Sequence, residues 1–477
     1  MHGGFNRADD RTAASSPLRT AVQLFLTCWL IYSLHWAPWL VREHFPAWAL
    51  AESGSLNVQT FLGWNDDIFP GQRGGAWINN SPGASILGAV PLVLGRPLLR
   101  YAESASRPAD IPLPPRDAVA YRRAFQENRF YVAMAVSFLT AVFLMAPLSA
   151  LAAALLFLSL ERHGLPHPLA LVAALAYAFA TPVFFRTLYL NHNLIVGQLS
   201  LIAFLLLQSD QRNIGRPPAA GALAGFTMLC DFTGFLVCAA LAVWCLARLG
   251  WRRAMVFSLA AAPGALGLMA YQFAAFGNAL LPPQHYMIPT APTSIGYRGF
   301  HWPSPTLAWA NLFEPRWGLL AYCPLLALAF VAPWVRAPRW KTPRSEAVLV
   351  YGLFAAMFLL SAANHYSWLQ WTTGFRYLLP TVPGFLLLSL QTLSASPRWL
   401  IWLALALSAL HQWFIAMTYQ YPAEAWRRVL GGGIDFAWLR EFRRFGLCAE
   451  WYWSPYLMAT LACFAVGLIW RRPSFPK

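Results

Sequence analysis

The sequence has little charge for its length. Of its 477 residues only 11% are Asp, Glu, Lys or Arg, whereas about a quarter of the residues in soluble proteins are charged. Hydrophobic residues make up 58% of the chain, so it is too apolar for disorder and has too little polar surface for a compact globule. This balance argues against a cytosolic enzyme, a secreted disulfide scaffold and a nucleic-acid-binding module. We therefore expect an integral membrane protein with no nucleic-acid partner.

Several familiar motifs are missing as well. The seven cysteines fall mostly inside apolar runs and form no CxxC pair, so we interpret them as packing residues. No Walker A, GxGxxG, GxSxG or HExxH sequence occurs in a suitable context, which argues against an ATP-driven pump and a membrane zinc protease. Charges inside apolar runs are nearly absent, and this disfavours an ion-coupled transporter, because such proteins bury ionisable relays.

Long apolar runs dominate what is present. A spanning helix needs roughly 20 mostly apolar residues. Runs that meet or approach this length lie at residues 20–41, 130–160, 169–185, 194–208, 219–246, 254–281, 317–335, 347–374, 377–394, 399–419 and 451–470. If the run 219–246 forms two short helices around Asp231, the sequence predicts an all-α, multi-pass bundle of about twelve transmembrane helices. Alternatively, that run is one long tilted helix.

The short loops indicate the orientation of this bundle. The short loops that carry Arg and Lys residues are every second connection between spans, so they share one side of the bundle with the basic N-terminus. The positive-inside rule makes that side cytoplasmic. The predicted parts are a tail (1–19), a core (20–383) with an outer loop (42–129), and C-terminal helices (384–477) with a second outer loop (420–450). Within the first outer loop, residues 76–95 predict a helix in the membrane interface, not a further span.

Two acidic sites stand out. Asp66 and Asp67 are adjacent in the first outer loop, where a carboxylate can act as a general base or hold a divalent cation. The same Asn-Asp-Asp sequence is also ordinary turn chemistry. Asp231 lies in the middle of an apolar run, and an acid there indicates a functional site. If the run breaks at that point, Asp231 is alternatively a helix cap.

Basic residues near the outer ends of spans are candidates for binding phosphate. Arg316 and Arg376 each mark such an end, and Arg298 is a third candidate. Arginine binds phosphate in a bidentate manner, although a single Arg at a helix end also snorkels to the interface. His192 lies in an outer turn and can donate to a phosphate or a sugar, or simply build the turn.

In chain order, these motifs resemble the GT-C superfamily of membrane glycosyltransferases, especially bacterial members related to lipid A aminoarabinose transferase and to protein O-mannosyltransferases. The resemblance extends from residue 20 to residue 383. It is carried by AESGSL (51–56), the Asp66–Asp67 pair, NNSPG (79–83), LAG (223–225), CDFTG (230–234), RWGLL (316–320) and GFRYL (374–378).

The resemblance implies an inverting transfer of a sugar from a polyprenyl-phosphate donor to an extracytoplasmic lipid, glycan or protein of the cell envelope. It makes Asp67 or Asp66 the catalytic base. It also implies binding of the donor phosphate by arginines in a site that faces outside the bacterial cytoplasmic membrane. No cofactor is implied beyond a possible divalent metal, and the partners are the lipid-linked donor and membrane lipids. The predicted substrate-binding residues are Arg316, Arg376, Arg298, His192, Asp231 and Asn80.

Two departures from the family pattern bear on activity. Many GT-C enzymes carry an acidic residue immediately after the first span, and here Glu43 is its displaced equivalent. Asn80 and Ser81 replace the Lys expected before Pro82. Either change would mean an altered donor, or a scaffold that has lost activity. The alternative function is a non-enzymatic lipid or polysaccharide transporter or assembly partner, which would also need contacts on the cytoplasmic side.

Overall fold

The computed structural model describes residues 16–105, 119–209, 215–287, 289, 291–336, 341–365, 375–444 and 454–471. Most of the predicted tail 1–19, the Pro-rich part of the outer loop 42–129 and the end of the outer loop 420–450 lie outside these residues. The described chain is mainly α-helical, which confirms the all-α class.

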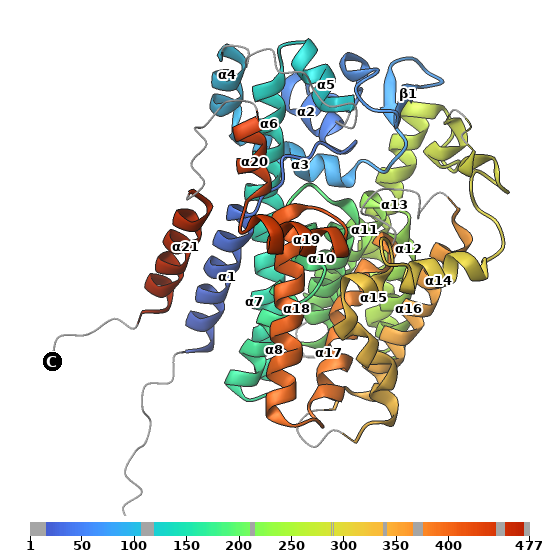
Figure 1. The fold of residues 1–477 in the computed structure, drawn as a ribbon. Helices are drawn as coiled ribbons and strands as arrows, with labels where there is room; N and C mark the ends of the chain where they lie inside the picture. The colour runs from blue at the N-terminus through green and yellow to red at the C-terminus, as the bar shows by residue number, and fades with distance from the viewer. Residues whose placement is uncertain are drawn as a thin grey trace, which may run out of the picture.

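The helices are numbered in chain order (Figure 1). Those of the first half are α1 (Pro17–Leu34), α2 (His44–Ser53), α3 (Gly83–Leu94), α4 (Arg96–Ser104), α5 (Val119–Gln126), α6 (Phe130–Thr140), α7 (Ala146–Arg162), α8 (His167–Phe179), α9 (Val183–Arg186), α10 (His192–Gln208), α11 (Arg216–Cys230) and α12 (Thr233–Leu249). Those of the second half are α13 (Trp251–Phe276), α14 (Pro305–Phe313), α15 (Leu319–Tyr322), α16 (Arg344–Ala363), α17 (Val382–Leu393), α18 (Arg398–Thr418), α19 (Pro422–Gly432), α20 (Ala437–Arg444) and α21 (Ser454–Trp470).

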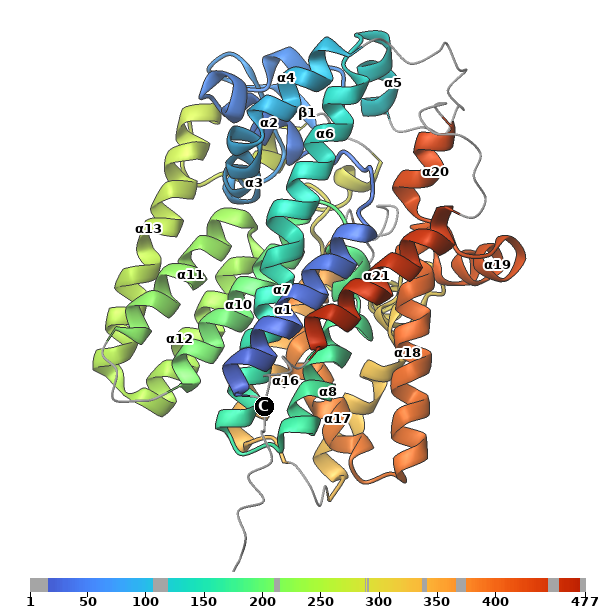
Figure 2. The same cartoon turned by 90° about the vertical axis from the view of Figure 1, so that its left-hand side faces the viewer.

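A smaller layer covers one end of the long helices (Figures 1 and 2). This loop layer comprises α2 to α5 and two antiparallel strands, β1 (Ile68–Pro70) and β2 (Ala76–Ile78). Helix α3 packs on α2 and also on α6, α10 and α11, so the layer is fixed to the bundle. The predicted interfacial segment 76–95 thus contains β2 and a short helix of 12 residues, which is too short for a span.

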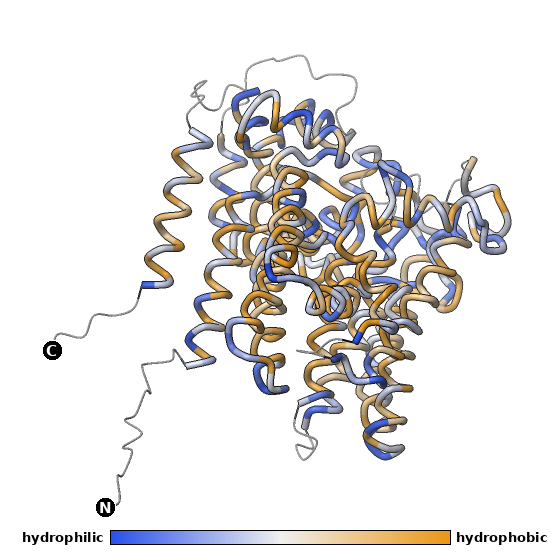
Figure 3. Tube along the Cα trace, turned by 60° about the horizontal axis from the view of Figure 1, so that its bottom comes forward, coloured by the Kyte–Doolittle hydropathy of each residue, from blue (hydrophilic) through white to orange (hydrophobic). Residues whose placement is uncertain are grey.

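Four of the described helices are long and apolar enough to cross a membrane, namely Phe130–Arg162, in which α6 continues into α7 through the π-helical segment Ala141–Met145, and α13, α16 and α18. Other apolar helices have 10 to 17 residues. Figure 3 shows hydrophobic residues along the helices and hydrophilic ones near their ends. These features support a membrane protein, while the count of about twelve spans stays a prediction.

Two helices are shorter than the apolar runs that contain them, and prolines explain where these helices end. Helix α1 ends at Leu34, although the apolar run continues to residue 41. Pro38 disfavours helical geometry at the residue before it, Ala37, so the helix ends before that position. Ala37 instead donates its N–H to the carbonyl of Leu188 at 2.8 Å. The predicted span 317–335 is a short α15 followed by a 3₁₀ helix, Pro324–Trp334, since Pro324 lacks the N–H that would continue the helix.

The run 219–246 is divided at Asp231, as the sequence predicts. Helix α11 ends at Cys230 and α12 begins at Thr233. The Asp231 carboxylate accepts hydrogen bonds from the Thr233 backbone N–H at 2.8 Å and from its hydroxyl at 2.6 Å. Asp231 thus lies one residue before the N-cap position of α12 and accepts from one backbone N–H that the helix start leaves without a partner.

The first and last described helices lie side by side (Figure 2). Gln23 of α1 donates its amide to the carbonyl of Ile469 at 2.8 Å, and the Trp470 indole donates to the Thr27 hydroxyl at 2.9 Å. Arg19 donates to the carbonyl of Arg471 at 3.3 Å. The start of α1 and the end of α21 are thus at the same end of the bundle.

Helices α11 and α13 approach closely because both carry glycine at their crossing. A Cβ atom at Gly264 would lie 1.9 Å from the carbonyl oxygen of Gly225, and one at Gly225 would lie 2.4 Å from that of Ala261. Small residues permit such backbone contact between membrane helices.

We expect Gly264→Ala to lower the free energy of unfolding by roughly 1–3 kcal/mol, the usual cost of overpacking. The measurement is equilibrium unfolding in mixed micelles with a denaturing detergent. Gly352→Ala on α16 is the matched control, because nothing lies within 4 Å of its added Cβ, and alanine favours the helix. Equal destabilisation by both variants would show that the glycine contact is unimportant.

Candidate active site

A cavity of about 210 Å³ lies between the loop layer and the adjoining ends of the bundle helices. The chain forms it from five places, all of which except Arg186 and residues 189–193 are far apart in sequence. These are residues 39–43 after α1, Asn65 and Asp67 in the loop layer, Arg186 at the end of α9, residues 189–193 at the start of α10, and Arg376.

The start of α10 is fixed by its own cap. The Asn191 side chain accepts a hydrogen bond from the Leu194 backbone N–H at 2.9 Å and donates to the Tyr189 hydroxyl at 2.7 Å. Asn is a favoured residue at this position because its oxygen satisfies a free N–H of the first turn. The cap makes His192 the first residue of the helix and directs it into the cavity wall.

Glu43 is a buried carboxylate surrounded by hydrogen-bond donors. Its Oε1 atom accepts hydrogen bonds from Arg42 Nε at 3.0 Å, Asn80 Nδ2 at 2.7 Å and His192 Nδ1 at 2.8 Å. The side chain is only 2% exposed, so these donors replace the water that a buried charge loses. Asn80, which the sequence predicts to bind substrate, is placed here as a donor to Glu43.

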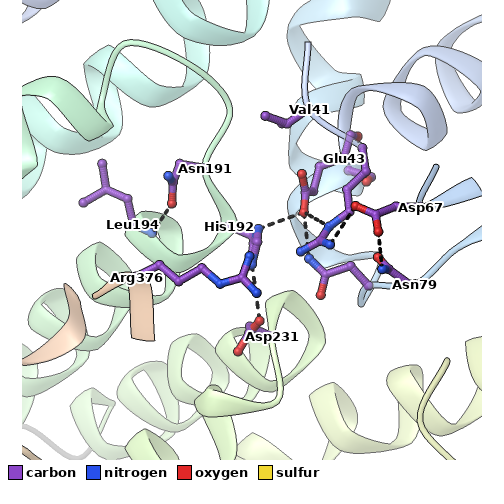
Figure 4. Close-up of polar contacts among 12 residues, drawn as sticks. Val41, Glu43, Asp67, Asn79, Asn191, His192, Leu194, Asp231 and Arg376 are labelled. Atoms are coloured by element: carbon purple, nitrogen blue, oxygen red, sulfur yellow. Dashed lines mark hydrogen bonds and ion pairs between the residues drawn. The ribbon is translucent and has the colours of Figure 1, made fainter. Parts of the chain in front are cut away.

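His192 lies between two carboxylates (Figure 4). Its Nε2 atom is 3.4 Å from Asp231 Oδ2, while its Nδ1 atom bonds Glu43. A ring with a carboxylate at each nitrogen donates from both, which requires the charged imidazolium. The Glu43–His192–Asp231 group therefore joins the loop layer, α10 and the α11–α12 turn. The sequence predicts His192 and Asp231 as candidates but does not pair them.

Charge and burial have opposite effects on the pKa values of Glu43 and His192. Burial by itself raises the pKa of Glu43, but the charges of His192 and Arg42, with hydrogen bonds from His192 and Asn80, hold that pKa well below its ordinary value. For His192, which precedes the apolar run 194–208, burial by itself lowers the pKa. The Glu43 charge and the bond to Asp231 outweigh burial, so the pKa of His192 is raised.

These shifts predict a pH window for stability. Because its pKa is raised on folding, His192 contributes fully below its ordinary value of 6.5, and the contribution is lost as the pH rises through the folded value. Glu43 contributes fully above its ordinary 4.5 and loses that contribution as the pH falls. The difference in unfolding free energy between the wild type and His192→Gln should therefore be largest between these two pH values and smaller at about pH 9. A difference that is constant from pH 5 to about pH 9 would contradict the charged bridge.

Asp67 is the more accessible carboxylate of the cavity. Its Oδ2 atom pairs with Arg42 Nη1 at 3.0 Å and its Oδ1 atom accepts from Asn79 Nδ2 at 2.6 Å. The side chain keeps 23% exposure. Asp66 is exposed and is not among the residues that line the cavity, so only one member of the acidic pair faces it. Asn65 accepts from the Asp67 backbone N–H at 2.9 Å, which is the turn chemistry expected of this sequence.

Two buried arginines also line the cavity. Arg376, predicted from the sequence, is 4% exposed and donates to the Tyr377 hydroxyl at 2.9 Å. Arg186 is fully buried and donates to the Tyr189 hydroxyl at 3.0 Å. Its guanidinium also lies about 5 Å from the ring of Phe375. The sequence interpretation missed Arg186, although it ends the run 169–185 in the same way that Arg376 begins the run 377–394.

The other predicted phosphate ligands lie elsewhere. Arg316 is exposed and Arg298 is half-buried, where it donates to the carbonyl of Met287 at 3.2 Å. Neither is among the lining residues. Asn193, which was also missed, lines the cavity and is 1% exposed. Its Nδ2 atom has no hydrogen-bond partner among the described residues, and a buried donor of this kind indicates a place for a ligand or water.

The cavity as a whole favours an anion. The described lining includes the cationic side chains of Arg42, Arg186, His192 and Arg376 against the carboxylates of Glu43 and Asp67. Within the described residues, no three His, Cys, Asp or Glu side chains are arranged to hold a metal ion. The arrangement can bind a phosphate at the arginines and remove a proton at Asp67.

No protein-family model matches the chain, and no curated protein matches it. The fold and the cavity therefore carry the functional argument. They define a helical protein with membrane-compatible helices and a buried, charged cavity at one end of its bundle.

Proposed function

We propose that the protein is an inverting glycosyltransferase of the GT-C type. It transfers a sugar from a polyprenyl-phosphate donor to an extracytoplasmic lipid, glycan or protein. The observation that carries the proposal is a single cavity with an accessible carboxylate, Asp67, and two buried arginines, Arg186 and Arg376. General-base catalysis and stabilisation of a departing phosphate require these two kinds of group.

In this reaction Asp67 accepts the proton of the acceptor hydroxyl or amine. The acceptor atom attacks the anomeric carbon from the side opposite the phosphate. The bond between that carbon and the phosphate oxygen breaks, and its electron pair remains on the oxygen of the lipid phosphate. Glu43 is a poorer base, because His192, Arg42 and Asn80 all donate to it and lower its pKa.

The two buried arginines stabilise the charge that develops on the leaving phosphate. A guanidinium removed from water interacts more strongly with an anion than an exposed one does. Arg42 is less suited to this role, because its guanidinium already bridges Glu43 and Asp67. The free donor of Asn193 adds a hydrogen-bonding group in the same cavity.

The proposed orientation follows from the basic ends of the helices. The start of α1 and the end of α21 lie at one end of the bundle, and His163 and Arg248 are close enough to Glu346 to affect it electrostatically. Basic short loops at one end favour the cytoplasmic side. The loop layer and the cavity then face outside the bacterial cytoplasmic membrane.

The proposal is tested by reconstitution. Purified protein in liposomes receives a panel of labelled polyprenyl-phosphate sugars together with lipid, glycan and protein acceptors from the cell envelope. We expect protein-dependent transfer of label from one of these donors, with inversion at the anomeric carbon. Absence of transfer from every donor, with the protein shown to be folded, would reject the proposal.

Arg376→Gln is expected to raise the KM for the polyprenyl-phosphate donor about tenfold or more, since it removes a charge-assisted hydrogen bond in a dry site. Arg316→Gln is the matched control, because that arginine is exposed and does not line the cavity. Its KM should stay within about twofold of the wild type. An equal rise in both variants would show that Arg376 has no special role in binding the donor.

A further inference from the structure

A second cavity, of about 230 Å³, lies at the opposite end of the bundle. Its walls come from α7, α10, α12, α16 and α17. Helix α10 connects the two cavities: it begins at the active site with His192 and reaches the second cavity with residues 200–208. The second cavity shares no lining residue with the first.

Much of the lining of this cavity is apolar. Leu156, Leu201, Phe204, Leu241 and Leu353 are among its lining residues. A dry apolar cavity of about 150 Å³ holds benzene, so this one takes a larger apolar group. Along α10 it extends from residue 200 to residue 208, a rise of about 12 Å. These dimensions suit part of a single acyl chain.

Polar groups of both charges form the rim of the cavity. Lys341 is exposed, and the Glu346 carboxylate is hydrogen-bonded to Gln208. Thr342 is 8% exposed, and its hydroxyl has no hydrogen-bond partner among the described residues. Its backbone N–H is already bonded to Gln391 at 2.8 Å. A buried hydroxyl without a partner, in a cavity that an ammonium and a carboxyl group also line, indicates a polar ligand.

We propose that this cavity binds one membrane phospholipid whose head group carries both a phosphate and a primary ammonium. The acyl chain enters between the apolar walls. The phosphate accepts hydrogen bonds from Lys341 and the Thr342 hydroxyl, and the ammonium donates to Glu346. A head group with only a phosphate would leave Glu346 facing an anion, and a quaternary ammonium has no hydrogen to donate. This proposal does not depend on the glycosyltransferase activity.

Native mass spectrometry of the full-length protein tests the proposal, with phosphatidylethanolamine, phosphatidylglycerol or phosphatidylcholine added in equal amounts. We expect preferential retention of phosphatidylethanolamine. Replacing both rim charges, with Lys341→Gln and Glu346→Gln together, should lower its occupancy roughly fivefold. Arg344→Gln is the matched control, because Arg344 is exposed on the same segment and does not line the cavity. Its occupancy should equal that of the wild type.

A further variant tests the position of the acyl chain. Leu201→Trp places a larger side chain in the apolar part and should abolish retention of phosphatidylethanolamine. Equal retention of the three lipids, or unchanged occupancy in the double rim variant, would overturn the proposal. Circular dichroism identifies any variant that fails to fold. If Leu201→Trp fails to fold, the occupancy of the double rim variant alone tests the proposal.

Discussion

Asp67→Asn is expected to lower the turnover number for sugar transfer about 100-fold or more, the usual contribution of a general base. Asparagine has nearly the same shape, and its carbonyl oxygen can still accept the hydrogen bond from Arg42 that the carboxylate now accepts at 3.0 Å. It cannot take a proton from the acceptor. We therefore expect a large fall in kcat with little change in the KM for the donor, measured in the reconstituted system.

Asp66→Asn supplies the matched control. The two acids are neighbours in sequence, but Asp66 is exposed and does not line the cavity. Its activity should stay within about twofold of the wild type, because surface changes away from a site have small effects. Full activity in both single variants would reject the assignment of the base. A loss of activity in Asp66→Asn alone would identify Asp66 as the general base.

Glu43→Gln is expected to lower the free energy of unfolding by about 3 kcal/mol, because removing one partner of a buried ion pair leaves its charged partners without compensation. The change removes a carboxylate to which both His192 and Arg42 donate, at a site where Glu43 is 2% exposed. Equilibrium unfolding in mixed micelles measures the difference.

The control for this variant is Glu52→Gln in the same layer. Glu52 pairs with Arg129 at 2.8 Å, but its side chain is 46% exposed, and exposed pairs contribute at most about 1 kcal/mol. A loss in Glu43→Gln no larger than that in Glu52→Gln would show that the three-residue bridge does not stabilise the protein.

Features that depend on local sequence could be predicted well. Asp231, two residues before Thr233 in an apolar run, favoured a break over one long helix, and the chain does turn there between α11 and α12. The sequence placed His192 in an outer turn between two spans, and in the structure it is the first residue of α10. Helix ends were less predictable where proline acts: the interruption at Pro324 shortens an apolar run whose composition alone predicts a span.

The partners within the site could not be predicted, because they come from distant segments. Glu43, His192 and Asp231 meet only after α2, α10 and the α11–α12 turn have packed together. For the same reason, the sequence could not show that Asn80 bonds Glu43 or that Arg186 shares a cavity with Arg376. Three of its candidate residues, Asp67, His192 and Arg376, line the cavity, but the sequence did not indicate the bridge between Glu43, His192 and Asp231.

The contact between α1 and α21 has a consequence for biogenesis. Gln23 and Thr27 are polar side chains on a helix that is synthesised early, and their hydrogen-bond partners on α21 come more than 400 residues later. Until α21 is synthesised, the Gln23 amide lacks its final partner, and a buried donor without a partner is costly. In a ribosome-bound chain that stops before α21, α1 should therefore keep its packing against α7 but lack its hydrogen bonds to α21.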